Sequence, residues 1–300
     1  MTEQLRKRSP GQAGFTLVEL LAIVAVLALL AATLPFGMAR TRPNSMGTQC
    51  LNNLRQVSVA WTLYATDHSD VVANNFGVIE TSTTIGAGQF GNWANNVLTW
   101  GASTSVADVS NTNVAWLAKG GLGKYLGSQL GALSCPADDY VSAAQRSAGW
   151  TGRTRSISMN SVFGRFNSSA AGDPTASGRN WAFQEYRQYL KQAQVPRPFK
   201  TWLFIEEHPD SINDGYFISN PMASNWQDIP AAFHHGGTSL AFGDLHCETK
   251  KWLSPTSRLS QVKYQYYTVN FDALGRQDYA WHLERTGWVN FSTGLPQFGY

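Results

Sequence analysis

The longest apolar stretch of the chain covers residues 15–34 and contains only three polar residues, Thr16, Glu19 and Thr33. No proline or glycine interrupts it. An α-helix rises ~1.5 Å per residue, so a stretch of this length covers the ~30 Å hydrocarbon core of a bilayer. The pattern therefore predicts a membrane helix, to which we assign residues 15–37.

Pro35, Gly37 and Pro43 interrupt the first helical pattern. A second helical pattern follows, and we assign it to residues 38–70. Its apolar residues recur every three or four positions and leave polar residues on the other side. They are Leu51, Leu54, Val57, Trp61 and Tyr64. The pattern predicts an amphipathic helix that continues the membrane helix as a stalk and packs its apolar side against a head.

Residues 71–300 contain shorter patterns that are typical of a globular head. Residues 71–131 are rich in Gly, Asn, Thr and Trp and predict short strands and loops. Residues 181–193 predict a helix, and residues 201–205 predict a strand. The aromatic-rich segment from Tyr264 onward predicts core packing more than ligand binding.

The charge of the chain does not favour a nucleic-acid partner. The formal net charge is +3, and Glu3, Arg6, Lys7 and Arg8 contribute +2 of it, which leaves about +1 from Phe15 onward. No basic patch remains that would hold a phosphate backbone, so we expect no nucleic-acid binding. Charged residues make up only 14% of the chain, which suits a protein exposed outside the cytoplasm. The positive-inside rule keeps the basic N-terminal segment in the cytoplasm.

Glu19 is a residue that a plain membrane anchor does not need. A carboxylate in hydrocarbon costs roughly 2.5–3.5 kcal/mol on insertion scales, so it normally has a partner. Cleavage after Gly14 would create a positively charged partner, the α-amine of Phe15, at the same depth in the membrane as Glu19. The alternative is that the side chain of Glu19 extends to the lipid headgroups nearby.

The residues around Glu19 resemble a known signal. The chain runs from Arg6-Lys7-Arg8 to Gly14-Phe15-Thr16-Leu17-Val18-Glu19 and then into the apolar stretch. This order resembles the N-terminal signal of type IV prepilins and type II secretion pseudopilins. The resemblance implies that a prepilin peptidase cuts after Gly14 and methylates Phe15, and that Glu19 pairs with the N-terminus of a neighbouring subunit during assembly. An ordinary secretory signal, cleaved after Ala39, is the alternative.

The resemblance also implies a fold and a location. It predicts a pilin-like α+β protein, in which one long N-terminal helix packs on an antiparallel β-sheet head. The chain would divide into a leader (1–14), a transmembrane and assembly helix (15–37), a stalk helix (38–70) and an extracytoplasmic head (71–300). Its partners would be prepilin peptidase, other pilin or pseudopilin subunits and lipid of the bacterial inner membrane. The protein would cross this membrane once, with the N-terminus in the cytoplasm and the head in the periplasm or on a filament.

Two cysteines lie in segments that are similar to the same family. Cys50 begins a C-x-x-N-L-R-Q pattern, and Cys135 lies in an L-x-C-P-x-D pattern. Outside the cytoplasm these two are natural disulfide partners. Cys247 is the third cysteine, so two other pairings and a set of buried free thiols stay open.

An acidic loop follows the predicted strand. Glu206, Asp210, Asn213 and Asp214 offer four oxygen-bearing side chains within nine residues, and Glu207 offers a fifth. Ca²⁺ takes six to eight oxygen ligands, and loops of this composition supply them. The spacing is not that of an EF-hand, so two interpretations stay open: a Ca²⁺ site, and an acidic turn held by Asx hydrogen bonds.

A histidine and an aspartate with nine residues between them form the next motif. They are His234 and Asp244, and Leu245 follows them. The pair resembles the C-terminal H-x9-D-G segment of a group of bacterial prepilin-like proteins, which here would cover residues 200–252. Leucine replaces the glycine of that pattern, and it costs conformational energy if the turn requires a positive φ. We expect a buried hydrogen bond between the histidine and the aspartate.

Catalysis by this motif is a weaker hypothesis. Imidazoles and a carboxylate at His234, His235, Asp244 and His246 are groups that bind Zn²⁺ or provide a general base. No H-E-x-x-H helix, G-x-S-x-G elbow or convincing nucleophile accompanies them in the sequence. We therefore expect no enzyme activity and no required cofactor, with Ca²⁺ as the one ion that the acidic loop suggests.

The sequence thus predicts an assembly subunit, either a pseudopilin or a minor pilin. Such a subunit enters a type II secretion pseudopilus or a type IV pilus-like filament through its N-terminal helix. The first alternative is a membrane-tethered periplasmic binding protein for a glycan or a cation, which never assembles. The second is a membrane-anchored, metal-dependent hydrolase.

Overall fold

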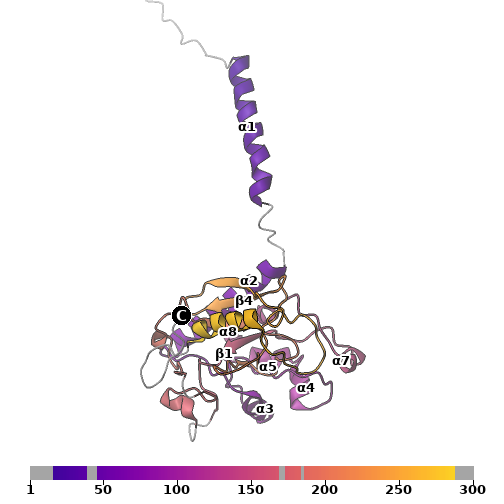
Figure 1. Ribbon diagram of the computed structural model, residues 1–300, viewed down its shortest axis with the longest axis vertical. Helices are drawn as coiled ribbons and strands as arrows, with labels where there is room; N and C mark the ends of the chain where they lie inside the picture. The colour runs from indigo at the N-terminus through magenta and orange to yellow at the C-terminus, as the bar shows by residue number, and fades with distance from the viewer. Residues whose placement is uncertain (1–15, 39–45, 169–172, 184–185, 288–300) are drawn as a thin grey trace, which may run out of the picture. The chain divides into compact units, whose positions relative to one another are not determined.

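The computed structural model describes residues 16–38, 46–168, 173–183 and 186–287. These residues fall in two units, one within residues 1–44 and one within residues 45–300. Helix α1 (Leu17–Met38) is the described part of the first unit, and the second unit is the head (Figure 1). The predicted α+β class is confirmed for the head, which combines helices with one central sheet.

A five-stranded sheet forms the centre of the head, in the order β3-β1-β2-β4-β5. Its strands are β1 (Ile157–Asn160), β2 (Trp202–Glu206), β3 (Tyr216–Phe217), β4 (Gly237–Phe242) and β5 (Cys247–Lys251). The residues of β1 to β4 are all buried, whereas β5 at the edge is partly exposed. Strands that are buried along their whole length belong to a sheet covered on both faces.

The sheet is mixed, so the predicted antiparallel sheet is wrong at one of its pairs. Strand β1 is antiparallel to β2 but parallel to β3. The other two pairs, β2 with β4 and β4 with β5, are antiparallel. The cause is the acidic loop, which carries the chain from β2 past β1 and reverses its direction. A strand that returns on the far side of β1 must then run parallel to it.

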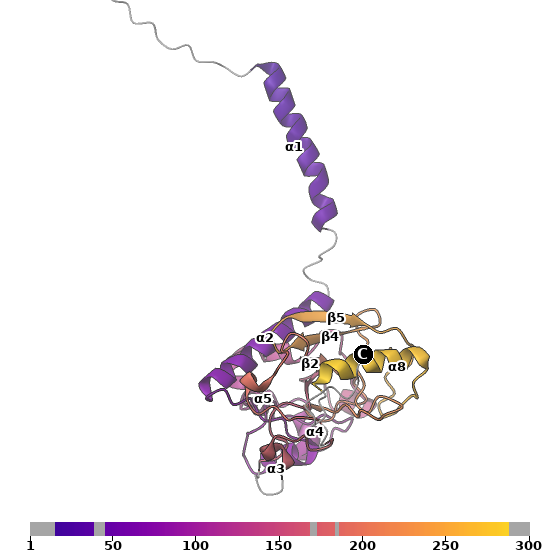
Figure 2. The ribbon, with the colours of Figure 1, turned by 60° about the vertical axis from the view of Figure 1, so that its left-hand side comes forward.

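Helix α2 (Met46–Asp67) packs against one face of the sheet (Figure 2). Leu54, Val57 and Trp61 of this helix are buried in the same core cluster as Leu203 and Phe204 of β2. These three helix positions belong to the apolar series that predicts an amphipathic helix. The prediction holds because the polar side chains between them face water while the apolar side meets the sheet.

Helix α8 (Ala273–Thr286) lies against the other face. Leu240 and Phe242 of β4 join a cluster that Trp281 of this helix contacts, whereas Ala241 between them belongs to the α2 side. This alternation follows from the two-residue period of a strand. The Asp272 side chain caps the start of α8 by accepting a hydrogen bond from the backbone of Gly275 at 2.6 Å.

Residues 71–131 form helices and loops, so the predicted loops are present, whereas helices replace the predicted short strands. Buried asparagines satisfy the backbone here: the Asn92 side chain accepts hydrogen bonds from the amides of Phe76 and Trp93, both at 2.9 Å. The helices of this part and of later loops are α3 (Val78–Gly86), α4 (Val106–Ser110), α5 (Val114–Ala118), α6 (Gly123–Leu126), η1 (Leu130–Leu133), α7 (Ala143–Ser147), η2 (Pro174–Ser177) and η3 (Gln192–Gln194).

The helix predicted over residues 181–193 is wrong. The described residues of this segment form isolated bridges, Tyr189 with Phe163 and Lys191 with Val71, followed by the short 3-10 helix η3. Tyr186 and Tyr189 are buried in the same core cluster as the apolar side of α2. Their packing across the core outweighs the weak local helix preference of the segment.

Candidate functional site

Helix α1 begins with a reciprocal cap. The Glu19 carboxylate accepts hydrogen bonds from the backbone amide and the hydroxyl of Thr16, both at 2.9 Å. The Thr16 hydroxyl in turn accepts one from the backbone amide of Glu19 at 3.3 Å. This is a capping box, which satisfies two backbone donors that a helix start would otherwise leave without partners. It also holds the carboxylate at the first turn of the helix.

Apart from Glu19, the described surface of α1 is apolar on all sides. Its exposed large side chains are Leu17, Val18, Leu20, Leu21, Ile23, Val24, Val26 and Leu27. An apolar surface of this kind normally lies in a membrane or against a partner. Among the residues whose side chains the structure describes, no helix combines the length and the apolar character needed to cross a membrane. The predicted span over residues 15–37 thus stays a prediction.

Gly14 and Phe15, the predicted cleavage and methylation site, lie outside the described residues. Comparison with protein families covers them. Residues 9–35 match the prokaryotic N-terminal methylation motif. The chain therefore carries a prepilin-like N-terminal signal, which fits a membrane-anchored or envelope protein. The head lies outside this match, and the chain matches none of the curated proteins and none of the solved structures.

The acidic loop does not bring its predicted calcium ligands together. The Asp210 carboxylate accepts hydrogen bonds from the backbone amides of Lys263 and Gln265, at 2.6 and 3.2 Å. The Asp214 carboxylate accepts one from the amide of Tyr216 at 2.8 Å, and Asn213 is exposed.

Glu206, the fourth predicted calcium ligand, also has its own partners. Its carboxylate contacts His234 and the backbone amide of Ser239. Calcium binding by the acidic loop stays a prediction.

A cluster of carboxyl groups with one arginine lies behind the loop, and of its members only Glu207 and Asp214 were among the residues that the sequence suggested as oxygen ligands. The side chains of Glu207 and Asp214 are buried, and that of Asp228 is half-buried. The fully buried Arg155 donates a hydrogen bond to the carbonyl of Asp214 at 2.7 Å. Burial raises the pKa of Glu207 to about 8, against the hydrogen bonds that its carboxylate accepts, and raises the pKa of Asp214 to about 6. Burial also raises the pKa of Asp228. The sequence carries no local signal for this cluster, because its members come from three separate segments.

A cavity of about 440 Å³ lies beside this cluster. Asp214 and Asp228 line it together with Phe166 and Trp181, whose rings stack at 4.2 Å between centroids and 15° between planes. The Trp181 side chain is 46% exposed. A cavity of this size, with aromatic walls and a few polar groups, has the properties of a small-ligand pocket. No local pattern in the sequence indicates this cavity, because its walls come from segments that are far apart in the chain.

His234 and Asp244 do not form the predicted hydrogen bond. They lie at opposite ends of the six-residue strand β4, which separates them by ~20 Å at ~3.3 Å per residue. His234 pairs with Glu206 instead, and Asp244 accepts a hydrogen bond from His246 at 2.5 Å. The backbone of Leu245 adopts φ +74°, the left-handed conformation that the glycine of the resembling pattern would favour.

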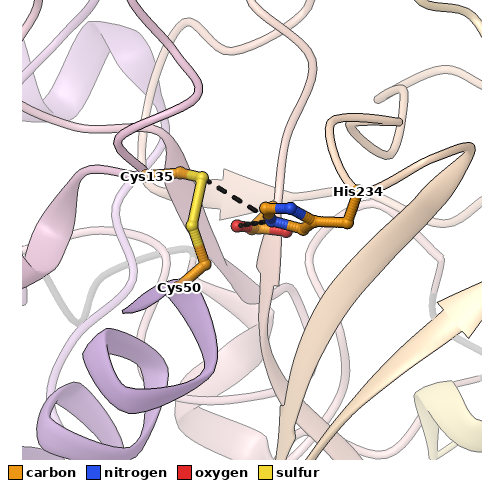
Figure 3. Close-up of side chains that lie close together, drawn as sticks. Cys50, Cys135 and His234 are labelled. Carbon is orange, nitrogen blue, oxygen red and sulfur yellow. Dashed lines mark hydrogen bonds and ion pairs between the residues drawn. A yellow bond between two sulfur atoms is a disulfide. The ribbon is translucent and has the colours of Figure 1, made fainter. Parts of the chain in front are cut away.

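His234 is instead part of a buried cluster with the cysteines (Figure 3). Cys50 on α2 and Cys135 after η1 form a disulfide, the pairing that the resemblance implies. The His234 Nε2 atom lies 3.7 Å from the Cys135 sulfur and 3.0 Å from an oxygen of Glu206. Closing a loop over a separation of 85 residues constrains the unfolded chain strongly, so the disulfide stabilises the head.

Proposed function

We propose that this protein is a pilin-like subunit, a pseudopilin or minor pilin, that assembles through its N-terminal helix. The observation that carries the proposal is the methylation motif over residues 9–35, with Glu19 inside an otherwise apolar helix. Before assembly, α1 holds the subunit in the inner membrane, and the head stays outside the cytoplasm. The disulfide between Cys50 and Cys135 suits such an oxidising location.

In this proposal the charge of Glu19 drives docking. Cleavage after Gly14 releases the amine of Phe15, which lies four residues before Glu19 in the chain. Within one subunit, the capping box already occupies the carboxylate with donors from Thr16. The amine of a neighbouring subunit then adds a positive charge at the same depth, where hydrocarbon excludes water and strengthens the attraction. The apolar sides of the helices pack against one another in the filament. The proposal includes no catalysis and no cofactor.

Mass spectrometry of the mature N-terminus tests this proposal. In cells that contain a prepilin peptidase, we expect the chain to begin with N-methylated Phe15. Deletion of the peptidase should leave residues 1–14 attached and stop assembly. A functional protein that retains residues 1–14 in peptidase-containing cells would contradict the proposal, and so would a chain that begins at Arg40.

A second candidate function is ligand binding by the head, and the cavity beside Trp181 favours it. The exposed indole offers a flat apolar face for a sugar ring, and the carboxyl groups of Asp214 and Asp228 offer hydrogen-bond partners for hydroxyl groups. Screening of the purified head against oligosaccharides tests this candidate. Trp116 of α5 does not line the cavity and serves as the control. Binding that Trp181→Ala abolishes and Trp116→Ala leaves intact would support a glycan site in the cavity. Absence of binding by the wild-type head would remove this candidate.

A further inference from the structure

The disulfide lies inside a set of metal-binding groups. Cys50, Cys135, Glu206 and His234 each place one sulfur, oxygen or nitrogen atom within 4.8 Å of the others, and all four residues are buried. They come from α2, the segment after η1, the end of β2 and the turn before β4. Two thiolates, an imidazole and a carboxylate form a donor set that Zn²⁺ takes in proteins.

We propose that the reduced head binds one Zn²⁺ through these four residues, and that the zinc site and the disulfide are alternative states of one cluster. A tetrahedral zinc site needs separations of ~3.3 Å between nitrogen and oxygen ligands, ~3.6 Å between nitrogen and sulfur, and ~3.8 Å between two sulfurs. The observed distances of His234 Nε2 from Glu206 Oε1 and from Cys135 Sγ are 3.0 and 3.7 Å. These two pairs are thus close to the separations that zinc needs, and reduction of the disulfide permits the two sulfurs to move apart to theirs.

The surroundings hold the two non-cysteine ligands in place. The second oxygen of Glu206 accepts a hydrogen bond from the backbone amide of Ser239 at 2.8 Å. His234 is fixed by a tight turn, in which its backbone exchanges hydrogen bonds with Gly237 at 3.2 Å and His235 and Gly236 adopt positive φ. Supporting contacts of this kind orient metal ligands and raise metal affinity.

The two states interconvert by a balanced reaction. Zn²⁺ binding to the two thiols releases two protons and forms two zinc–sulfur bonds. Oxidation by a thiol oxidase that carries a disulfide forms the S–S bond between Cys50 and Cys135 and breaks the two zinc–sulfur bonds, which releases Zn²⁺. The oxidant's own disulfide accepts the two electrons and two protons from water and breaks to give two thiols. A newly made head is in the reduced state until an oxidant has acted on its two cysteines. Zinc would hold the two correct cysteines together at that stage and keep them from pairing with Cys247.

Cobalt titration of the full-length protein in detergent tests the proposal. The protein carries Cys247→Ser, so that only the cluster thiols remain, and is reduced with a phosphine without oxygen. We expect one Co²⁺ per chain, with a thiolate-to-cobalt charge-transfer band and the absorption of a tetrahedral site, and displacement of Co²⁺ by an equal amount of Zn²⁺. The oxidised protein should bind neither ion, and bound Zn²⁺ should slow disulfide formation by a small-molecule disulfide.

Matched variants assign the ligands. His234→Gln and Glu206→Gln should each weaken Zn²⁺ binding by more than the ~10–100-fold that loss of a supporting contact costs. His246→Gln, whose ring pairs with Asp244 outside the cluster, should bind Zn²⁺ as the parent does. Recovery of the disulfide on oxidation shows which variants have a folded head, and only these are titrated. Absence of the charge-transfer band in the reduced parent, or unchanged affinity in a folded His234→Gln, would overturn the proposal.

Discussion

The Glu19 carboxylate accepts two hydrogen bonds from Thr16, one from its backbone amide and one from its hydroxyl. The residue that is proposed to act as a charge in assembly therefore also serves as a helix cap in the single subunit. These two roles differ chemically. A cap needs an acceptor oxygen at this position, which glutamine also provides, whereas pairing with an amine needs a negative charge.

Glu19→Gln and Thr16→Ala separate these two roles. Glu19→Gln keeps the capping oxygen and removes the charge, so we expect processing by the peptidase to continue while incorporation into filaments falls strongly. Thr16→Ala removes the cap at a cost of about 1 kcal/mol, which only loosens the first turn, and should reduce incorporation slightly. The measurement is the fraction of processed protein in sheared filaments. Normal assembly of Glu19→Gln together with failure of Thr16→Ala would show that the cap, not the charge, matters.

The disulfide should account for a large part of the stability of the head. Replacing Cys50 and Cys135 together by serine frees a loop with a separation of 85 residues, for which the chain-entropy argument gives about 4.5 kcal/mol. We expect a loss of this size in the free energy of unfolding, measured with urea under oxidising conditions. Cys247→Ser is the control, because Cys247 forms no disulfide in the structure and its half-buried side chain changes little in size. Equal losses in both proteins would mean that the disulfide adds no stability.

Leu245 should destabilise the turn between β4 and β5. Its φ of +74° is a conformation that a Cβ atom disfavours and glycine adopts freely. Both Leu245→Gly and Leu245→Ala remove the side-chain atoms beyond Cβ, and only glycine also lacks Cβ. Comparing the two variants therefore isolates the cost of holding a residue with a Cβ atom at positive φ. We expect the glycine variant to be the more stable of the two by about 1 kcal/mol in urea unfolding. An alanine variant as stable as the glycine variant would show that the turn relaxes without cost.

His282 should make the head sensitive to acid. Its ring is fully buried among aromatic rings, with Trp202 and Trp226 at 5.2 and 5.0 Å, and burial lowers its pKa from 6.5 to about 3. Below pH ~6.5 the unfolded state binds a proton that the folded state does not bind until about pH 3. The stability from this group is therefore complete above pH ~6.5 and is lost as the pH falls toward 3, by several kcal/mol.

Urea unfolding between pH 7 and pH 4 measures this effect. His282→Gln should flatten the pH dependence, whatever its effect on stability at neutral pH. Tyr279→Phe is the control, because it removes a hydroxyl from the same cluster without changing a group that titrates in this range. Its curve should run parallel to that of the wild type. If His282→Gln also runs parallel, another group causes the acid sensitivity.

Local patterns in the sequence were sufficient to predict helices α1 and α2 and the N-terminal signal. The apolar stretch of α1 and the three-to-four-residue spacing of Leu54, Val57 and Trp61 are readable because a helix repeats over neighbouring residues. The methylation motif lies in one continuous segment, residues 9–35, for the same reason. The expected strain at Leu245 was also local, since it depends on a single backbone turn.

Apart from the disulfide between Cys50 and Cys135, which the resemblance implied, only the tertiary structure decided which distant side chains meet. His234 faces Glu206, 28 residues earlier, and not Asp244, because β4 extends between the histidine and the aspartate and brings the start of β4 to the end of β2. The parallel pair of β1 and β3, the cavity beside Trp181 and the cluster around the disulfide also join segments that are far apart in sequence. Such contacts depend on strand order and register, which are fixed by packing across the whole core and leave no periodic trace in the residues themselves.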